Sequence, residues 1–156
     1  MAVPYDRRFR GNVAVHQPVT LLDNPSQCYK LAAPETDNEF SPSVALASPG
    51  RGGNWADGSA SCSLVNTILP PGGPSVAISG EQAVDGIYTS SSYHPIGVNV
   101  ALVDGSVRSM SRDVDAGNLR HPAFTQEEFA FQPPSPYGVW GALGTRAGEE
   151  VDHLNW

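Results

Sequence analysis

Two kinds of side chain in this chain could do chemistry: an imidazole near a carboxylate, and the thiols of two cysteines. His94 and Asp104 are separated by nine residues, and a histidine beside a carboxylate is a common pair for proton transfer. An extended segment of that length holds its ends up to ~30 Å apart. We therefore predict no catalytic residue. Because His94 precedes Pro95, we interpret it as a structural residue that fixes the entry to a strand.

Motifs for catalysis, metals or cofactors are weak elsewhere in the chain. No G-x-S-x-G segment marks an activated serine, and the glycines around Arg51 lack the lysine of a phosphate loop. Residues 113–118 supply oxygen ligands that calcium prefers, but not the 12-residue loop that ends in glutamate. We expect no enzyme, cofactor or metal site, and calcium at 113–118 remains an alternative.

The two cysteines, Cys28 and Cys62, allow two interpretations. If they were bonded, the closed loop would stabilise the fold by about 3–4 kcal/mol. If they are not, they are free thiols. The four histidines, at positions 16, 94, 121 and 153, are too scattered for zinc ligands, and the chain has no C-x-x-C segment.

The charge of the chain restricts its partners. Its net charge is −7, from 9 basic and 16 acidic residues, whereas nucleic-acid binding depends on clustered Lys and Arg. Only Arg7, Arg8 and Arg10 cluster, and we interpret residues 1–22 as a solvated N-terminal arm before one domain over 23–156. The chain has no apolar run of ~18 residues. We expect neither nucleic-acid nor membrane contact, and a soluble chain as given.

The composition and the turn signals predict the elements that must position these residues. With 16 Gly and 14 Pro, the chain favours an α+β fold: an antiparallel sheet with short flanking helices and long Pro/Gly-rich loops. The strongest signal is Asp104-Gly105 between two β-prone runs, at 97–103 and 106–110. It predicts a hairpin with a two-residue type I′ turn, in which Leu102 lies opposite Val107.

Weaker signals predict the remaining elements. Asn24 could cap a helix that starts at Pro25 and carries Cys28. Ser135 and Pro136 could start another helix, with Trp140 on the face that docks on the sheet. Further predictions are an edge strand at 44–46, a buried strand at 62–69, a strand at 75–79 and a helical turn at 125–131.

The exposed or buried state of the aromatic residues decides between two roles. Trp55 lies in a glycine-rich turn, and we expect its indole to pack inward as a core anchor. The alternative is a site at which aromatic faces stack on a glycan or a small ligand. The residues that could form it are Trp55, Tyr88, Tyr93, Tyr137 and Trp140.

Residues 92–108, S-Y-H-P-I-G-V-N-V-A-L-V-D-G-S-V-R, resemble the H-x9-DG motif of a bacterial family of prepilin-type proteins. In this chain the motif consists of His94, Asp104 and Gly105. Three further segments resemble the same family in the expected order: residues 51–58 around Trp55, residues 66–71, and residues 138–149 around Trp140. Together the resemblance covers roughly residues 50 to 150.

The resemblance implies a pseudopilin-like domain of unknown detailed function. In that family the domain follows an N-terminal cleavage and methylation motif and a long hydrophobic helix, and a type IV pilus or type II secretion system exports and assembles the protein. This chain shows no such processing site and no apolar stem. The expected partners are other pilin-like subunits or cell-surface components. With a stem, the expected location is extracytoplasmic or at the cell surface.

Overall fold

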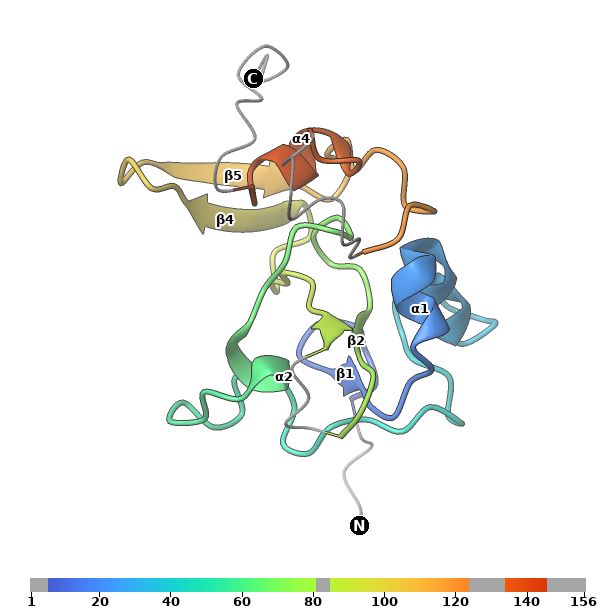
Figure 1. Ribbon diagram of the computed structural model, residues 1–156. Helices are drawn as coiled ribbons and strands as arrows, with labels where there is room; N and C mark the ends of the chain where they lie inside the picture. Colours follow the sequence, from blue (N-terminus) through green and yellow to red (C-terminus); the bar gives the residue numbers. More distant parts are fainter. Residues whose placement is uncertain (1–5, 81–84, 124–133, 146–156) are drawn as a thin grey trace.

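The computed structural model describes residues 6–80, 85–123 and 134–145, and its architecture is α+β (Figure 1). One sheet has three strands in the order β1-β2-β3, and the other is the hairpin β4–β5. Short helices and long loops surround both sheets, as predicted. In chain order the elements are β1 (Val13–Ala14), α1 (Thr20–Asp23), the 3-10 helix η1 (Pro25–Leu31), α2 (Ala60–Ser63), β2 (Ser75–Ala77), β3 (Gly86–Ile87), β4 (Gly97–Ala101), β5 (Val107–Ser111) and α4 (Gly138–Ala142).

Each strand of the three-stranded sheet contributes to the main core. The main core is the cluster of the buried residues Phe9, Ala14, Leu21, Cys28, Phe40, Ile68, Leu69, Val76, Ile87, Ala123 and Tyr137. β1 pairs with β2 in parallel, and β2 pairs with β3 antiparallel. Val13 and Ala14 are buried together with the strand β2, which is why β1 is a continuous apolar run and shows no alternation. The predicted edge strand at 44–46 is reduced to a single bridge between Leu46 and Ala14. The predicted strand at 75–79 is confirmed over β2.

The described part of the N-terminal segment, from residue 6, belongs to this core. The sequence predicts a solvated arm over 1–22, but Phe9 is buried and stacks on Phe40, with 4.7 Å between the ring centroids. The guanidinium of Arg7 donates hydrogen bonds to the carbonyl oxygens of Phe40, Ser41 and Val44. Arg7 thereby closes the loop around Phe40 over the start of the chain, and the arm interpretation is corrected.

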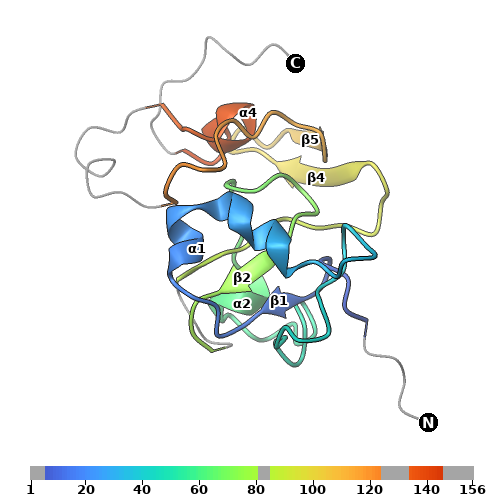
Figure 2. The same cartoon turned by 90° about the vertical axis from the view of Figure 1, so that its right-hand side faces the viewer.

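The helix predicted after Asn24 exists as η1, with Pro25 in its first turn and Cys28 buried. The side chain of Asn24 does not cap it. The Oδ1 atom of Asn24 instead accepts a hydrogen bond of 2.6 Å from the Ser26 hydroxyl. Figure 2 shows α1 and η1 lying below the hairpin and α4, on one side of the three-stranded sheet.

The hairpin is confirmed, but its predicted register is wrong by one residue. Val107 pairs with Ala101, and Val98 pairs with Met110. The N–H of Leu102 donates to the Ser106 carbonyl, and the N–H of Gly105 donates to the Leu102 carbonyl. The loop therefore has three residues. Only Gly105 has a positive φ (+82°), whereas a type I′ turn would need one at Asp104 too.

The predicted buried strand at 62–69 is also wrong. Its start lies in the one-turn helix α2, and Leu64 and Val65 are about half exposed. Only Ile68 and Leu69 enter the core. Residues 62–69 therefore form no strand. They form an irregular segment, which we call the crossing segment, and it buries apolar side chains only at Ile68 and Leu69.

The helix α4 docks on the hairpin, as predicted, although it begins at Gly138 and its N-cap residue is Tyr137. Trp140 packs with Val98 and Met110 in a separate cluster. Its indole N–H donates a 2.8 Å hydrogen bond to the carbonyl of Leu69. The helical turn predicted at 125–131 lies outside the described residues. Among those that are described, no helix has the length and apolar run to cross a membrane.

Candidate functional site

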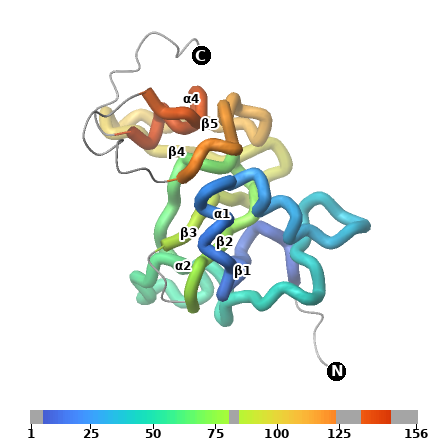
Figure 3. The backbone as a smooth tube through the Cα atoms, turned by 45° about the vertical axis from the view of Figure 1, so that its right-hand side comes forward, coloured from blue at the N-terminus to red at the C-terminus, as the bar shows by residue number. Residues whose placement is uncertain are grey.

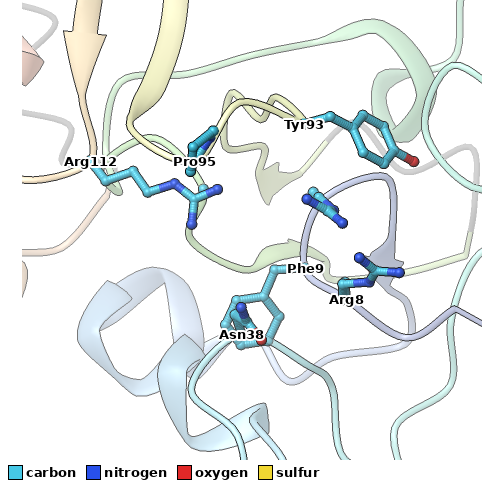
Figure 4. A pocket seen from close by; sticks show the side chains of 8 residues that line it. Arg8, Phe9, Asn38, Tyr93, Pro95 and Arg112 are labelled. Carbon is cyan, nitrogen blue, oxygen red and sulfur yellow. The ribbon is translucent and has the colours of Figure 1, made fainter.

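A cavity of about 330 Å³ lies where the N-terminal segment meets the entry and exit of the hairpin (Figure 4). In Figure 4, Arg112 reaches in beside Pro95 from one side, and Arg8 and Tyr93 lie on the opposite side. We call this space the arginine cavity. It is lined by Arg8, Phe9, Arg10, Asn38, Gly72, Tyr93, Pro95 and Arg112.

Arg10 and Tyr93 form the centre of this surface. The guanidinium carbon of Arg10 lies 4.4 Å from the centroid of the Tyr93 ring, a cation–π distance. The same two residues also line both neighbouring cavities, which have volumes of about 370 and 270 Å³. The stack thus separates three adjoining depressions. The Tyr93 ring is exposed, whereas the Nε atom of Arg10 is buried and has no hydrogen-bond partner among the described residues.

Arg112 and Arg8 complete the positive charge of the arginine cavity. Arg112 follows β5 directly, and its backbone N–H donates to the Ile96 carbonyl. Its guanidinium lies against Gly72, where an added Cβ would come within 3.1 Å of Nε. Gly72 therefore leaves the room that the guanidinium occupies. Arg8 forms a partly exposed ion pair with Asp6, in which Nε lies 3.0 Å from Oδ1.

The sequence predicts part of this site, but not which residues come together in it. It singled out Arg7, Arg8 and Arg10 as a cluster, but assigned them to a solvated arm. The structure separates them: Arg7 bonds to carbonyls of the loop around Phe40, whereas Arg8 and Arg10 line the cavity. Arg112 is about a hundred positions away, and no sequence signal connects it to them.

The motif residues do not meet in a site. The side chain of His94 is exposed and forms no hydrogen bond or ion pair within the described part of the chain, and its backbone N–H donates to the Ser92 hydroxyl. Asp104 lies at the far end of β4, in the hairpin turn, where Oδ1 accepts a 2.8 Å hydrogen bond from the Ser106 N–H. His94 and Asp104 thus lie beyond opposite ends of one strand.

The five aromatic residues considered for glycan stacking divide into two groups. Tyr88, Tyr137 and Trp140 are buried. Trp55 is 95 % exposed, so the expectation that it packs inward as a core anchor is wrong. The glycine-rich turn projects its indole into solvent. Of these five residues, only Trp55 and Tyr93 therefore present aromatic surface to a ligand.

Both cysteines are free thiols. Cys28 is completely buried, and burial raises the pKa of its thiol to about 12. Cys62 lines a neighbouring cavity together with Arg51 and is half-buried. Over the described residues, no group of three or more His, Cys, Asp or Glu side chains could hold a metal ion. In the segment considered for calcium, Oδ1 of Asp115 accepts a hydrogen bond from the Gly117 N–H.

Comparison with known proteins gives one result. The model of a family described as a protein of unknown function (DUF1559) matches residues 10–117. The match includes β1 to β5, and it also includes Arg10, Tyr93 and Arg112 of the arginine cavity. No curated protein and no solved structure matches the chain.

Proposed function

The chain belongs to the family of proteins of unknown function DUF1559, and from this premise we propose that it is a non-catalytic surface-interaction domain of a pilin-like exported protein. Its partners would be other pilin-like subunits at the cell surface. The H-x9-DG resemblance supports the pilin-like part of the proposal. The shape of the hairpin supports the part that concerns interaction.

The observation that carries the proposal is the projecting tip of β4–β5, which stands at the margin of the molecule in Figures 1 and 3. Val103 at the tip is fully exposed and Val107 is 67 % exposed. Ala101, the cross-strand partner of Val107, is exposed too. Adjacent apolar side chains in solvent are typical of protein contact surfaces.

The strand edges of the hairpin point to the same use. In the described part of the chain, β4 pairs only with β5, so each strand has one edge without a strand partner. Such edges can pair with a strand of another protein unless they are protected. A neighbouring pilin-like subunit could therefore bind through backbone hydrogen bonds and cover the valines of the tip.

Site-specific photo-crosslinking tests this proposal. A photoreactive residue at position 103, introduced into the protein produced in its own cells, should form crosslinks to pilin-like subunits. The matched control carries the same residue at Arg120, which is exposed. The preceding residue, Leu119, accepts a hydrogen bond from the Ser26 N–H in η1, outside the hairpin. Crosslinks of equal yield at both positions, or none at position 103, would contradict the proposal. So would a complete gene whose reading frame encodes no hydrophobic stem.

A further inference from the structure

We propose that the arginine cavity is a binding site for a compact dicarboxylate. This inference goes beyond the interaction function, because the cavity lies at the base of the hairpin and not at its tip. Arg10 comes from the N-terminal segment and Arg112 from the end of β5, and both line the same space. The fold thus brings two guanidinium groups together from distant parts of the chain.

The charge of these two guanidinium groups is not balanced inside the cavity. Among the described residues, neither the Arg10 nor the Arg112 side chain forms a hydrogen bond or an ion pair, and the one ion pair at the cavity joins Arg8 to Asp6. The chain has 16 acidic residues and a net charge of −7, so carboxylates are abundant elsewhere. Asp6, which pairs with Arg8, also interacts electrostatically with Arg10 at longer range. Two guanidinium groups that form no ion pair among the described residues favour an external anion.

The donors that remain available fit carboxylate groups. Stacking on Tyr93 occupies a face of the Arg10 guanidinium, and Nε is buried. The two Nη groups form no hydrogen bond among the described residues, and together they form a planar fork that matches a carboxylate. The backbone N–H groups of Phe9 and Gly72 already donate to the carbonyls of Asn38 and Ser90. Phosphate loops bind through a row of free backbone amides. The Phe9 and Gly72 amides are occupied, and the cavity offers side-chain guanidinium forks.

The size of the cavity and the charge of the protein define the ligand further. A volume of about 330 Å³ lies at the lower end of ligand pockets and exceeds the needs of a single carboxylate. Arg112 reaches in from the side opposite Arg8, so the positive groups can engage two carboxylates on one molecule. A long polyanion would be repelled by the acidic remainder of the protein. A small dicarboxylate avoids that repulsion.

Calorimetric titration of the complete chain with succinate tests the proposal. Succinate should bind, and the uncharged analogue succinamide should bind at least about tenfold more weakly, because each charge-assisted hydrogen bond is worth that factor or more. Arg112→Gln and Arg10→Gln should each weaken succinate binding by about tenfold or more. Arg120→Gln, which removes the same charge from an exposed arginine outside the cavity, should leave the binding unchanged.

Three results would overturn the proposal. The first is a folded wild-type chain, verified by circular dichroism, that does not bind succinate at millimolar concentration. The second is inorganic phosphate binding more tightly than succinate, which would assign the cavity to phosphate. The third is an equal loss in Arg120→Gln and Arg112→Gln, which would show general charge attraction. If Arg10→Gln does not fold, Arg112→Lys tests the proposal instead. This variant keeps the positive charge but lacks the planar guanidinium fork, and it should still bind succinate more weakly than the wild type.

Discussion

At the scale of single residues, Cys28 combines complete burial with a titratable group. It lies in η1 within the main core and has no disulfide partner. Removing water from around the thiolate raises the pKa of Cys28 from 9.0 to about 12. In the unfolded chain the thiol is solvated and its pKa returns to the ordinary value. Folding is therefore coupled to the protonation of this one side chain.

The coupling predicts a loss of stability in alkali. Above pH 9 the unfolded chain releases the Cys28 proton while the folded chain keeps it, so stability falls as the pH rises towards 12. Between pH 9 and pH 10 the loss from this group should be about 1 kcal/mol. Burial also raises the pKa values of Tyr29 and Tyr88, but from 10.0, so their effect begins later.

Urea unfolding of the wild type and of Cys28→Ala at several pH values measures this effect. The variant loses the titrating group, and its free energy of unfolding should therefore fall less steeply between pH 9 and pH 10 than that of the wild type. Parallel slopes for the two proteins would show that Cys28 does not titrate differently in the folded and unfolded chains.

The surroundings of Trp140 and Trp55 show how far the burial of a side chain can be predicted from the local sequence. The sequence correctly placed Trp140 against the sheet, because its helix carries apolar residues at helical spacing. It wrongly placed Trp55 in the core, because a large aromatic ring is usually buried and glycines permit either direction. Which way a flexible turn projects its side chain depends on distant packing. Local sequence does not contain that information.

At the scale of elements, the β4–β5 hairpin shows how a correct element can have an incorrect register. An Asp-Gly pair fits both a two-residue turn and the end of a three-residue loop, since glycine takes the positive φ in either case. The observed loop spares Asp104 a positive φ, which is strained for any residue with a Cβ. The one-residue shift brings Val98 and Met110 opposite one another under Trp140.

This geometry predicts that Gly105→Ala destabilises the protein by about 1–2 kcal/mol. An added Cβ at Gly105 meets no atom within 4 Å, so the cost comes from the φ of +82° alone. Gly58→Ala is the matched control, because its site is equally open and its φ is not positive. Thermal unfolding of both variants measures the difference. Equal melting temperatures would contradict the observed loop conformation.

At the scale of the whole molecule, one hydrogen bond joins two separate apolar clusters. Trp140 packs with Val98 and Met110, while Leu69 belongs to the main core. The indole N–H of Trp140 donates to the Leu69 carbonyl across 71 positions of sequence. This bond links α4 to the segment that carries Leu69 through the main core, beside the hydrogen bond from the Thr67 hydroxyl to the Gly141 carbonyl. Loss of this bond would leave a buried carbonyl without its partner.

Trp140→Phe should therefore lower the free energy of unfolding by about 1–3 kcal/mol for the unpaired carbonyl, with a further cost from the smaller ring. Trp55→Phe should change it by less than about 0.5 kcal/mol, because Trp55 lies in solvent. Urea unfolding followed by circular dichroism compares the two without relying on tryptophan fluorescence. A similar loss in both variants would contradict the role of Trp140 as the joint.

The predictable part of the fold is the local part. The hairpin, η1 and β2 each have turn or cap signals within a few residues, and all three were predicted from the sequence. The pairing of β1 with β2 and the crossing segment at 62–69 depend on contacts between distant residues. The arginine cavity belongs to this second class, because Arg112 acquires its neighbours only when the chain has closed on itself.

The parallel pairing of β1 with β2 also determines when the chain can complete its structure during synthesis. Val13 is synthesised 62 residues before its partner Ser75. Leu69 precedes its hydrogen-bond donor Trp140 by 71 residues. Contacts of such large sequence separation form slowly, because loop closure must precede them. β1 therefore stays without its strand partner while the residues up to β2 are synthesised, and its apolar residues are open to chaperones during that interval.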